Sequence, residues 1–252
     1  MDKLLTVVIP SYNVEKFLNQ TLDSFVCDEA VMKKFEVIVV DDGSKDNTAK
    51  IGKEYADKYP DTFRVISKEN GGHGSTINCG IRNAVGKYFK VVDGDDWVNT
   101  ADFVKLVEDL EKTESEYVFT NYYEYYDDVN RQKAVDFPQF KDGTEYDFAD
   151  VANKVYIPMH ALVIKTSVLK DNNIVIDEKC FYVDVEYVMF PVPFVNKVTF
   201  FDLHVYMYRL ALSTQSVSIL GFQKHINDHL RVTFHMFDFY RDYISSDKAD
   251  SA

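Results

Sequence analysis

The stretch YFKVVDGDDW, residues 88–97, carries an apolar strand pattern directly into three carboxylates, those of Asp93, Asp95 and Asp96. Carboxylates this close repel one another, and burial alone would destabilise their charged forms. A hard divalent cation relieves the repulsion, because Mg²⁺ and Mn²⁺ prefer oxygen ligands and share them with substrate phosphates. The stretch therefore predicts a metal site at the end of a buried strand. The alternative is a solvated acidic loop in which Asp96 caps the following turn.

Three similar strand patterns precede this one. Apolar runs over residues 4–9, 35–40 and 63–67 alternate with helix patterns over about 14–26, in a segment ending near 59, and over about 75–84. Strands and helices that alternate in this way predict right-handed crossovers and a parallel sheet. Ligands of such sheets bind beyond the carboxyl ends of the strands. Polar groups that follow the strand ends are therefore expected to converge at one edge: Tyr12, Asp42, Asn70 and residues 93–96.

The pattern becomes mixed after residue 100. Helices are predicted over about 101–112 and 222–243, and apolar strands at 117–121, 161–164 and 198–201, with a polar stretch to about 144. The expected fold class is α/β, with a mostly parallel central sheet flanked by helices and a mixed second half. The polar residues at 245–252 are expected to fray, and the frayed end could mark a truncated chain.

The composition limits the kind of partner. The net charge of −13 argues against a nucleic-acid polymer, which needs clustered Lys and Arg, and against simple electrostatic docking on an anionic membrane. The three cysteines are odd in number and widely spaced, as in a reduced cytosolic protein. The apolar run at 4–9 is too short for a signal peptide or a membrane span, so a cytoplasmic location is expected.

Groups at the earlier strand ends could bind a nucleotide. The ring of Tyr12 could stack on a base, and one of Asp41 and Asp42 could accept the N3–H of a uracil while the other caps the next helix. The loop NGGHG, residues 70–74, opens a helix and resembles a phosphate-cradling turn, but it lacks the residues of a P-loop. For this loop, simple turn formation and a ligand-facing role both stay open.

Two later segments hold further candidates. Asp184 or Glu186, in an aromatic surrounding, could be a general base whose pKa is raised by apolar neighbours, although Asp184 could equally cap a helix. His204 and Arg209, with Ser213 close behind, could reach a pyrophosphate. A surface ion pair is the simpler explanation of Arg209.

Three ordered motifs give these residues a family resemblance. VIPSYN at 8–13, VVDDGS at 39–44 and VDGDD at 92–96 stand in an order and spacing that resemble glycosyltransferase family two, and the sequences at 70–72 and 78–80 also look like that family. The resemblance is specific over residues 4–100 and looser to about 216. It implies a GT-A fold, a nucleotide-diphosphate-sugar donor and inversion at the anomeric carbon.

The resemblance also implies a division of the chain and roles for the candidates. Residues 1–215 would form one GT-A catalytic domain, with a nucleotide-binding half at 1–100 and an acceptor-side half at 101–215, and 216–252 would be a helical extension and tail. Asp95 would coordinate Mn²⁺ or Mg²⁺, and Asp184 would be the catalytic base, although Val183 precedes it where the family has Glu. The nucleotide would contact Pro10, Tyr12, Asp42, Asn70 and Asp93, and the diphosphate would contact His73, Arg209 and Ser213 or Ser216.

The implied activity is transfer of a hexosyl or N-acetylhexosaminyl group. The donor would be a UDP-sugar and the acceptor a hydroxyl of a glycan or lipid-linked glycan, as in polysaccharide biosynthesis for the cell envelope. Peripheral association with the inner face of the membrane stays open. Two other functions also stay open: a sugar nucleotidyltransferase, whose usual glycine-rich N-terminal loop has no counterpart at 9–12, and a non-catalytic nucleotide- or glycan-binding module, which Val183 suggests.

Overall fold

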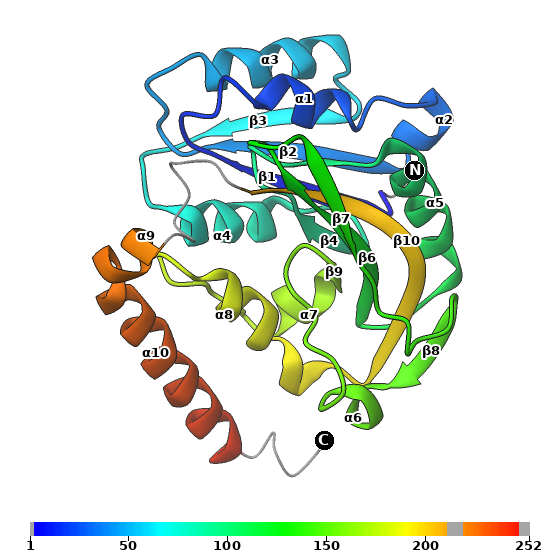
Figure 1. Cartoon of the computed structure of the whole chain (residues 1–252), viewed down its shortest axis with the longest axis vertical. Coiled ribbons are helices and arrows are strands. Elements are labelled where there is room, and N and C mark those ends of the chain that lie inside the picture. Colours follow the sequence, from blue (N-terminus) through cyan, green and yellow to red (C-terminus); the bar gives the residue numbers. More distant parts are fainter. Residues whose placement is uncertain (1–2, 211–218, 247–252) are drawn as a thin grey trace.

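The apolar run near the N-terminus forms β1 (Leu5–Ser11), a strand that is buried along its whole length. In the computed structural model, which describes residues 3–210 and 219–246, β1 lies between β2 (Phe35–Asp41) and β4 (Tyr88–Val91), and β3 (Phe63–Ser67) lies beyond β2 (Figure 1). All three pairings are parallel. The predicted parallel half of the sheet is therefore confirmed.

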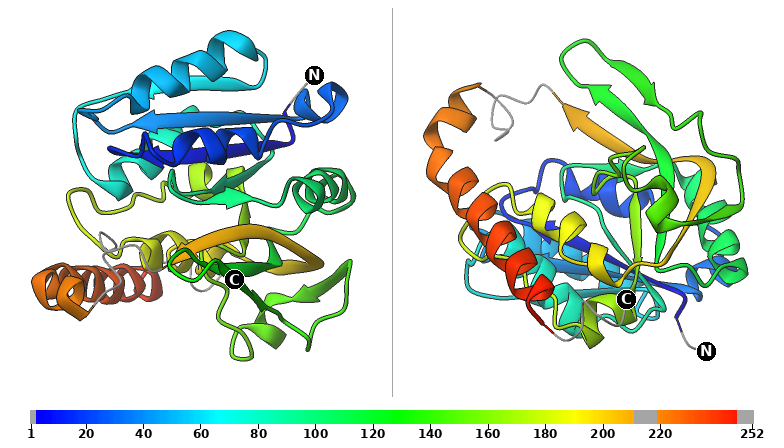
Figure 2. Two further views of the ribbon diagram at one scale, coloured as in Figure 1. Left: turned by 45° about the horizontal axis from the view of Figure 1, so that its top comes forward. Right: turned by 90° about the horizontal axis from the view of Figure 1, so that it is seen from below.

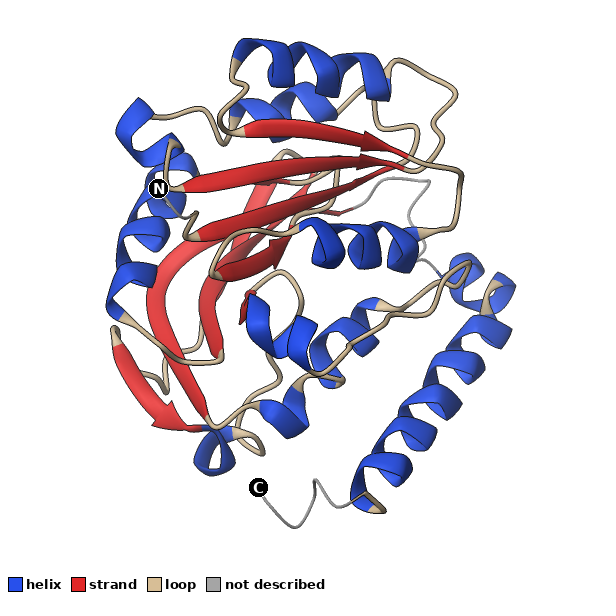
Figure 3. Ribbon diagram, turned by 180° about the vertical axis from the view of Figure 1, so that it is seen from behind, coloured by secondary structure: helices blue, strands red, loops and turns tan. Residues whose placement is uncertain are grey.

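The side chains of β1 point alternately to the two faces of the sheet, and each face carries its own apolar core. Val8 belongs to one core and Val7 and Ile9 belong to the other. Figure 3 shows the sheet between two layers of helices. On the side of Val7 lie α1 (Leu18–Asp23), α2 (Glu29–Met32), α3 (Thr48–Lys58) and α5 (Thr100–Asp109), and on the side of Val8 lie α4 (His73–Asn83), α7 (Thr166–Asp171), α8 (Asp184–Met189) and α10 (Ile226–Ile244).

The second half of the chain extends the sheet with mixed pairing, as predicted. The strand β9 (Leu162–Lys165) runs antiparallel between β4 and β6 (Tyr117–Tyr126), and β10 (Lys197–Leu210) is parallel to β6. At the margins β5 (Trp97–Val98) and β8 (Thr144–Asp147) pair with β10, and β7 (Arg131–Val135) pairs with β6. Short helical segments complete the described chain: α6 (Phe148–Val151), α9 (Ile219–Lys224) and 3₁₀ turns at Leu110–Lys112 and Val192–Phe194.

The helix predicted over 14–26 is shorter than its apolar pattern suggested, because α1 begins only at Leu18. The backbone N–H groups of residues 13–15 donate to side chains of the loop after β2: Asn13 to Ser44, Val14 to Thr48 and Glu15 to Asp46. Asn13 also has a positive φ of 54°. Side-chain acceptors therefore satisfy these donors and hold the segment in an extended turn.

The strands of the second half are longer than predicted. β10 continues to Leu210, well past the predicted end at residue 201. The prediction ended too early because the pairing of β10 with β6 shifts register between Phe201 and Tyr206, which interrupts the apolar alternation. β6 continues through its tyrosine-rich stretch and turns back into β7, whose residues are almost all exposed. An exposed hairpin has no apolar face to reveal it, and the sequence analysis assigned it to the polar stretch. Similarly, the helix predicted over 222–243 is broken at His225 between α9 and α10.

Helix α10 packs along α8 at the outer margin of the molecule (Figure 2). Among residues 3–210 and 219–246, none of the helices combines the length and the apolar character that crossing a lipid bilayer requires.

Gly86 lies at a close contact between the backbone of β1 and the residues just before β4. It is buried, its N–H donates to Thr6 Oγ1 at 2.9 Å, and a Cβ at this position would press on the backbone of Leu5 and Thr6. Because backbone atoms of a central strand cannot move aside, we expect Gly86→Ala to lower the free energy of unfolding by about 1–3 kcal/mol, measured by urea denaturation. Val85→Ala is the matched control, since Val85 is 63% exposed and its loss should change stability by less than about 0.5 kcal/mol. Equal unfolding midpoints for the two variants would contradict the close contact.

Candidate active site

The carboxyl ends of β1, β2 and β4 open onto a cavity of about 640 Å³. Residues that follow three separate strands meet there, as the strand-end argument predicts. Nine of the residues singled out in the sequence line it: Pro10, Tyr12, Asp42, Asn70, His73, Asp93, Asp95, Asp96 and Asp184. The cavity therefore brings the motif residues of the first hundred positions together with one carboxylate from the second half.

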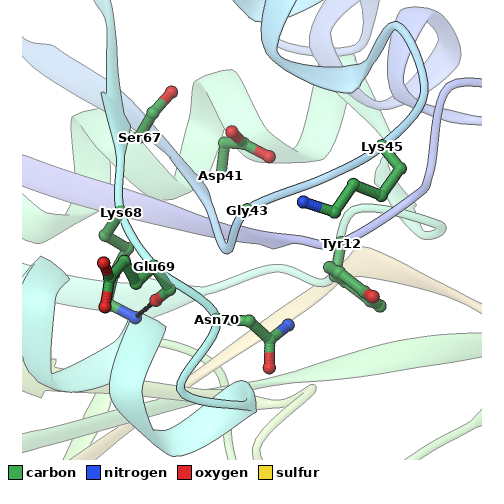
Figure 4. Close-up of a pocket in the computed structure, with 8 residues that line it drawn as sticks. All are labelled: Tyr12, Asp41, Gly43, Lys45, Ser67, Lys68, Glu69 and Asn70. Atoms are coloured by element: carbon green, nitrogen blue, oxygen red, sulfur yellow. Dashed lines mark hydrogen bonds between the residues drawn. The ribbon is translucent and has the colours of Figure 1, made fainter.

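A second hollow of about 520 Å³ adjoins the cavity, and Tyr12 and Asn70 line both. Figure 4 shows Tyr12 and Lys45 on one side of this hollow and Ser67 and Lys68 on the other. The side chain of Tyr12 is 50% exposed, so one face of its ring is available to a ligand.

The two aspartates that end β2 have different surroundings. The Asp42 carboxylate is buried and accepts hydrogen bonds from Lys68 Nζ (2.7 Å), Gly71 N (2.9 Å) and Gly72 N (2.8 Å). Asp41 instead accepts from the backbone of Ser44, within the turn that precedes α3. Asp41 thus holds the local turn, while Asp42 braces the glycine loop at the wall of the cavity. The predicted capping of the next helix by one of the two aspartates is wrong, since Asn47 holds the N-cap position of α3 and the N–H of Thr48 donates to Asp46. The uracil contact of the other aspartate stays a prediction.

The glycine loop is both a turn and a wall of the cavity. Gly72 has φ +82° and lies beside the backbone of Lys179, and the N–H of Lys179 donates to Gly71 O at 2.6 Å. A side chain at Gly74 would collide with the carbonyl of Asp177. The glycines therefore let the start of α4 approach the loop at 177–182, which closes the opposite side of the cavity.

The acidic loop at 93–96 is clamped by β10. The buried Asp96 carboxylate accepts from the Tyr206 hydroxyl (2.6 Å) and from Arg209 N (2.7 Å), while Thr21 Oγ1 of α1 donates to Asp96 O at 2.6 Å. The alternative of a solvated loop in which Asp96 is a cap is wrong, since Asn99 caps α5 instead. Asp96 is an internal anchor.

The pKa values of the three neighbouring carboxyl groups are shifted in different directions. Burial and then the neighbouring Asp93 raise the pKa of Asp95 to about 6. Burial, followed by Asp95 and Asp93, holds the pKa of Asp96 well above its ordinary value. Burial would raise the pKa of Asp93 as well, but His73 Nε2 donates to it at 2.8 Å and keeps it low. The loop thus carries negative charge that the protein does not fully neutralise.

A divalent cation fits this donor set. Oxygen atoms of Asp93 and Asp96 and a ring nitrogen of His160 lie within 4.8 Å of one another, and Asp95 lines the same cavity. Mg²⁺ and Mn²⁺ accept such ligands, and a cation would offset the repulsion that raises the pKa values. Asp95 was the one metal ligand predicted from the sequence, and the geometry adds His160 and Asp96 as candidate donors.

His160 was missed because no local pattern marks it. It reaches the cavity because buried Lys90 of β4 donates to its carbonyl at 2.8 Å and its ring stacks on Tyr208 with centroids 3.9 Å apart. Burial lowers the pKa of His160 to about 4 and that of Lys90 to about 7. The imidazole of His160 is therefore neutral at pH 7, the form that ligates metals.

Asp184 and Glu186 are separated by the structure. Asp184 is the first residue of α8, lines the cavity, and has a pKa raised by burial. Glu186 is fully buried outside the cavity lining, where its carboxylate accepts from Asp177 N (2.7 Å) and His235 Nδ1 (2.9 Å). Helix capping by Asp184 is wrong, since Val183 holds the N-cap position. Val183 itself is buried in the apolar core, which accounts for its character.

Arg209 does not reach the cavity. Its guanidinium donates to Asp95 O (2.8 Å), to Gln20 Oε1 (2.6 Å) and to Asp127, and it lies 4.7 Å from the ring centroid of Trp97. Arg209 is buried, so neither the expected diphosphate contact nor a surface ion pair agrees with its position. Its bond to Asp95 O supports the acidic loop. His204 bonds to Asp136 and is not part of the lining, and Ser213 and Ser216 fall outside the described residues.

The loop at 179–182 is a further wall that the sequence analysis missed. Lys179, Cys180, Phe181 and Tyr182 line the cavity, and positive φ values at Lys179 (53°) and Tyr182 (65°) turn their side chains toward it. The rings of Phe181 and Tyr182 lie on His225 and His229 of the α9–α10 segment, with centroids 3.8 and 3.6 Å apart. These contacts join segments about 45 residues apart, so no short sequence window displays them.

A comparison of the sequence with family models finds one match, to glycosyl transferase family 2, over residues 6–172. This range is more than half of the chain and contains β1–β4 with the acidic loop. The chain belongs to glycosyl transferase family 2. The predicted family is thereby confirmed, although the match ends before Asp184, whose role as catalytic base stays a prediction.

Two named relatives match somewhat less than half of the chain. The uncharacterized glycosyltransferase EpsJ of Bacillus subtilis (strain 168) is 37% identical over 123 residues, which are 49% of this chain and 35% of EpsJ. The minor teichoic acid biosynthesis protein GgaB of the same organism is 33% identical over 111 residues, which are 44% of this chain and 12% of GgaB. The similarity therefore spans about a third or less of each relative's length.

Solved structures confirm the GT-A fold. The crystal structure of residues 1–349 of S. aureus TarS superposes with a TM-score of 0.73 at 22% identity, covering 97% of this chain and 66% of that one. Its complex with UDP-GlcNAc gives a TM-score of 0.71 at 20% identity, covering 96% and 73%. At this identity the likeness establishes the fold.

The raised pKa of Asp95 predicts a site that costs stability when no metal is present. Because the folded pKa is about 6 and the ordinary value is 3.8, the folded state binds more protons between these values and stability falls as pH rises through them. Asp95→Asn removes this cost, so with chelator at pH 7.5 we expect it to raise stability by about 1–2 kcal/mol and Tm by about 3–6 °C. The gain should vanish near pH 4.

Asp57→Asn is the control for a lost surface charge, since the Asp57 side chain is 65% exposed in an ion pair with Lys53. It should leave Tm nearly unchanged at both pH values. A lower Tm for Asp95→Asn at pH 7.5 would show that the Asp95 carboxylate stabilises the metal-free fold.

Proposed function

We propose that this protein is an inverting glycosyltransferase that moves a sugar from a nucleoside-diphosphate donor to an acceptor hydroxyl. The observation that carries the proposal is the single cavity that joins Tyr12 and Asp42, the acidic loop and Asp184. A half-exposed aromatic ring suits a base, crowded carboxylates suit a metal–diphosphate, and a desolvated carboxylate suits a general base. Family membership supports the same reaction class.

The donor is UDP-linked in this proposal. Tyr12 stacks on the base beside Pro10 and Asn70, Asp42 accepts the uracil N3–H with a lone pair that its backbone bonds leave over, and Asp93 binds the ribose or sugar. The bound UDP-GlcNAc of the TarS structure supports this choice of nucleotide. His73, at the first turn of α4, stands where a diphosphate would meet the helix N-terminus.

Asp95, with Asp93, Asp96 and His160 around it, would hold Mn²⁺ or Mg²⁺. When bound, such a cation supplies positive charge to the departing diphosphate. The protein contributes the arrangement: Tyr206 and Arg209 fix the loop from behind, so that the donor atoms need not reorganise.

Asp184 acts as the general base. Its carboxylate takes the proton of the acceptor hydroxyl as that oxygen bonds to the anomeric carbon, and the bond from this carbon to the diphosphate breaks on the opposite face. Burial raises the pKa of Asp184 above its ordinary value, which makes the carboxylate a stronger base. A single displacement inverts the configuration and needs no second carboxylate as nucleophile.

The acceptor in this proposal is a hydroxyl of a glycan or lipid-linked glycan, and the transferred group is a hexosyl or N-acetylhexosaminyl unit. The name of GgaB, a minor teichoic acid biosynthesis protein, supports an acceptor of this kind. The proposal further places the reaction in cell-envelope synthesis at the inner face of the membrane. A sugar nucleotidyltransferase would instead release pyrophosphate from UTP and a sugar 1-phosphate. A non-catalytic binding module would bind UDP-sugars without consuming them.

Asp184→Asn tests the chemistry. We expect the release of UDP from a UDP-sugar in the presence of acceptor to fall by about 10²–10⁴-fold, because the amide cannot take the proton. UDP affinity, measured by calorimetry, should stay within about twofold. Glu186→Gln is the matched control two residues away: it alters a carboxylate outside the cavity lining and should keep turnover within about tenfold, with a lower Tm from its lost bonds. The reverse ranking of the two variants would reassign the base to Glu186.

The metal requirement is tested by binding. In a thermal-shift screen of nucleotide sugars, a UDP-sugar at about 100 times its Kd should stabilise by about 2.7 kcal/mol with Mn²⁺ present. Asp95→Ala should abolish the metal-dependent part of the shift, and Asp57→Ala should preserve it. Calorimetry that finds equal UDP affinity in chelator and in Mn²⁺ would overturn the role of the cation.

A further inference from the structure

Helix α10 is apolar on two opposite faces. Its inner face packs on the core through Val232, Met236 and Phe239. Its outer face carries five large apolar side chains that are 50–71% exposed: Ile226, Leu230, Phe234, Phe237 and Ile244. Their spacing of three, four or seven residues places them on one side of the helix. A contiguous apolar stripe on the surface of a soluble protein is typical of an interaction site.

The helix cannot turn this stripe inward, because polar contacts fix its inner face. Tyr240 donates to Met189 O at 2.5 Å, and Tyr243 donates to Pro193 O at 3.3 Å. His235 bonds to the buried Glu186, and Arg231 pairs with Asp177 at 2.8 Å. The outer stripe is therefore a fixed, exposed surface of the described part of the chain. Figures 1 and 2 show α10 at the margin of the molecule.

We propose that the outer face of α10 is a homodimer interface, in which it packs antiparallel against the same face of a second copy. A two-fold axis near residue 235 places Ile226 opposite the partner's Ile244 and Phe234 opposite the partner's Phe237. Both pairs occur twice, once on each side of the axis, as an isologous interface requires. Apolar side chains thus meet apolar side chains at the centre and at both ends.

Charges on the flank of the stripe fit the same axis. Arg231 and Asp238 lie seven residues apart, and so on the same flank of the helix, at nearly equal distances from residue 235. Their side chains are 50% and 57% exposed. Across the axis each Arg231 faces the partner's Asp238, so opposite charges meet there in addition to the pairs that Arg231 makes with Asp177 and Asp238 makes with Arg241 within each copy. The apolar stem of Arg241 covers the partner's Leu230, the remaining position of the stripe.

These features favour a second copy over a lipid surface. Helices that lie on membranes present Lys and Arg on their polar face, whereas two of the basic residues of this segment are already paired: Arg231 with Asp177, and Arg241 with Asp238 and Asp242. The net charge of −13 further opposes an anionic bilayer.

The size of the interface sets the expected affinity. The stripe runs along a helix of 19 residues, about 28 Å long. One helix pair of this length buries on the order of 1,000 Å², at the low end for a specific contact, so the dimer should be reversible with a Kd in the micromolar range. This inference does not depend on the proposed activity.

Sedimentation equilibrium of the chain from about 1 to about 200 µM tests the interface across the expected Kd. We expect a monomer–dimer equilibrium in the wild type and at least about a tenfold weaker Kd in Phe234→Glu, which places two charges at the centre. Val175→Glu is the matched control: Val175 is also 62% exposed but lies outside α10, so this variant should dimerise as the wild type does. Unchanged Tm values would show that both variants fold.

A charge reversal at Asp238 distinguishes the antiparallel arrangement from other contacts. Asp238→Arg should weaken the dimer by placing two arginines opposite each other, and Asp238→Asn, which removes the charge without reversing it, should weaken the dimer less. A monomer at every concentration, or a dimer that Phe234→Glu leaves intact, would overturn the proposal. Flotation of the chain with phosphatidylcholine vesicles in place of dimer formation would also overturn it and assign the stripe to lipid.

Discussion

The buried carboxylate of Asp96 joins the two halves of the molecule. It ends the loop that follows β4, and its oxygens accept from the Tyr206 hydroxyl and from Arg209 N of β10. The Tyr206 hydroxyl in turn accepts from Asp93 N at 3.1 Å, and the Arg209 guanidinium donates to Asp95 O. A carboxylate buried next to two others is unfavourable unless each bond is made. The cavity therefore exists only where β10 is in place, although β10 lies more than 100 residues further along the chain.

This dependence explains which parts of the fold were predictable. The first four strands are mostly apolar runs, and a polar residue ends or closely follows each of them, so their bounds followed from local pattern within a residue or two. β10 was recognised over four residues only, because its bulge breaks the alternation where it turns toward the acidic loop. The residues of β10 that matter to the site, Tyr206 and Arg209, therefore lay in a segment without a predicted element.

The candidate site shows the same division between local and distant information. Strand-end reasoning indicated that Tyr12, Asp42, Asn70 and the acidic loop would converge, and they line one cavity. The position of a residue at a strand end does not show which of two adjacent carboxylates turns toward the core, so the role predicted for Asp96 was wrong. The roles predicted for Arg209 were wrong because its contacts lie on distant segments. The partners of Asp96 and Arg209 come from β10, α1 and β5, which no window of the sequence places together.

Helix α8 shows how contacts on one side of a helix can position a residue on the other side, here the proposed base Asp184. Residues two apart on a helix differ by about 200° in direction, so Asp184 faces the cavity while Glu186 faces α10. The bonds of Glu186 to Asp177 N and His235 hold α8 between the loop at 177–182 and α10. The rings of Phe181 and Tyr182, on the same loop, lie on His225 and His229 at the other end of this contact. The placement of Asp184 thus depends on α10, a helix that contributes no residue to the cavity lining.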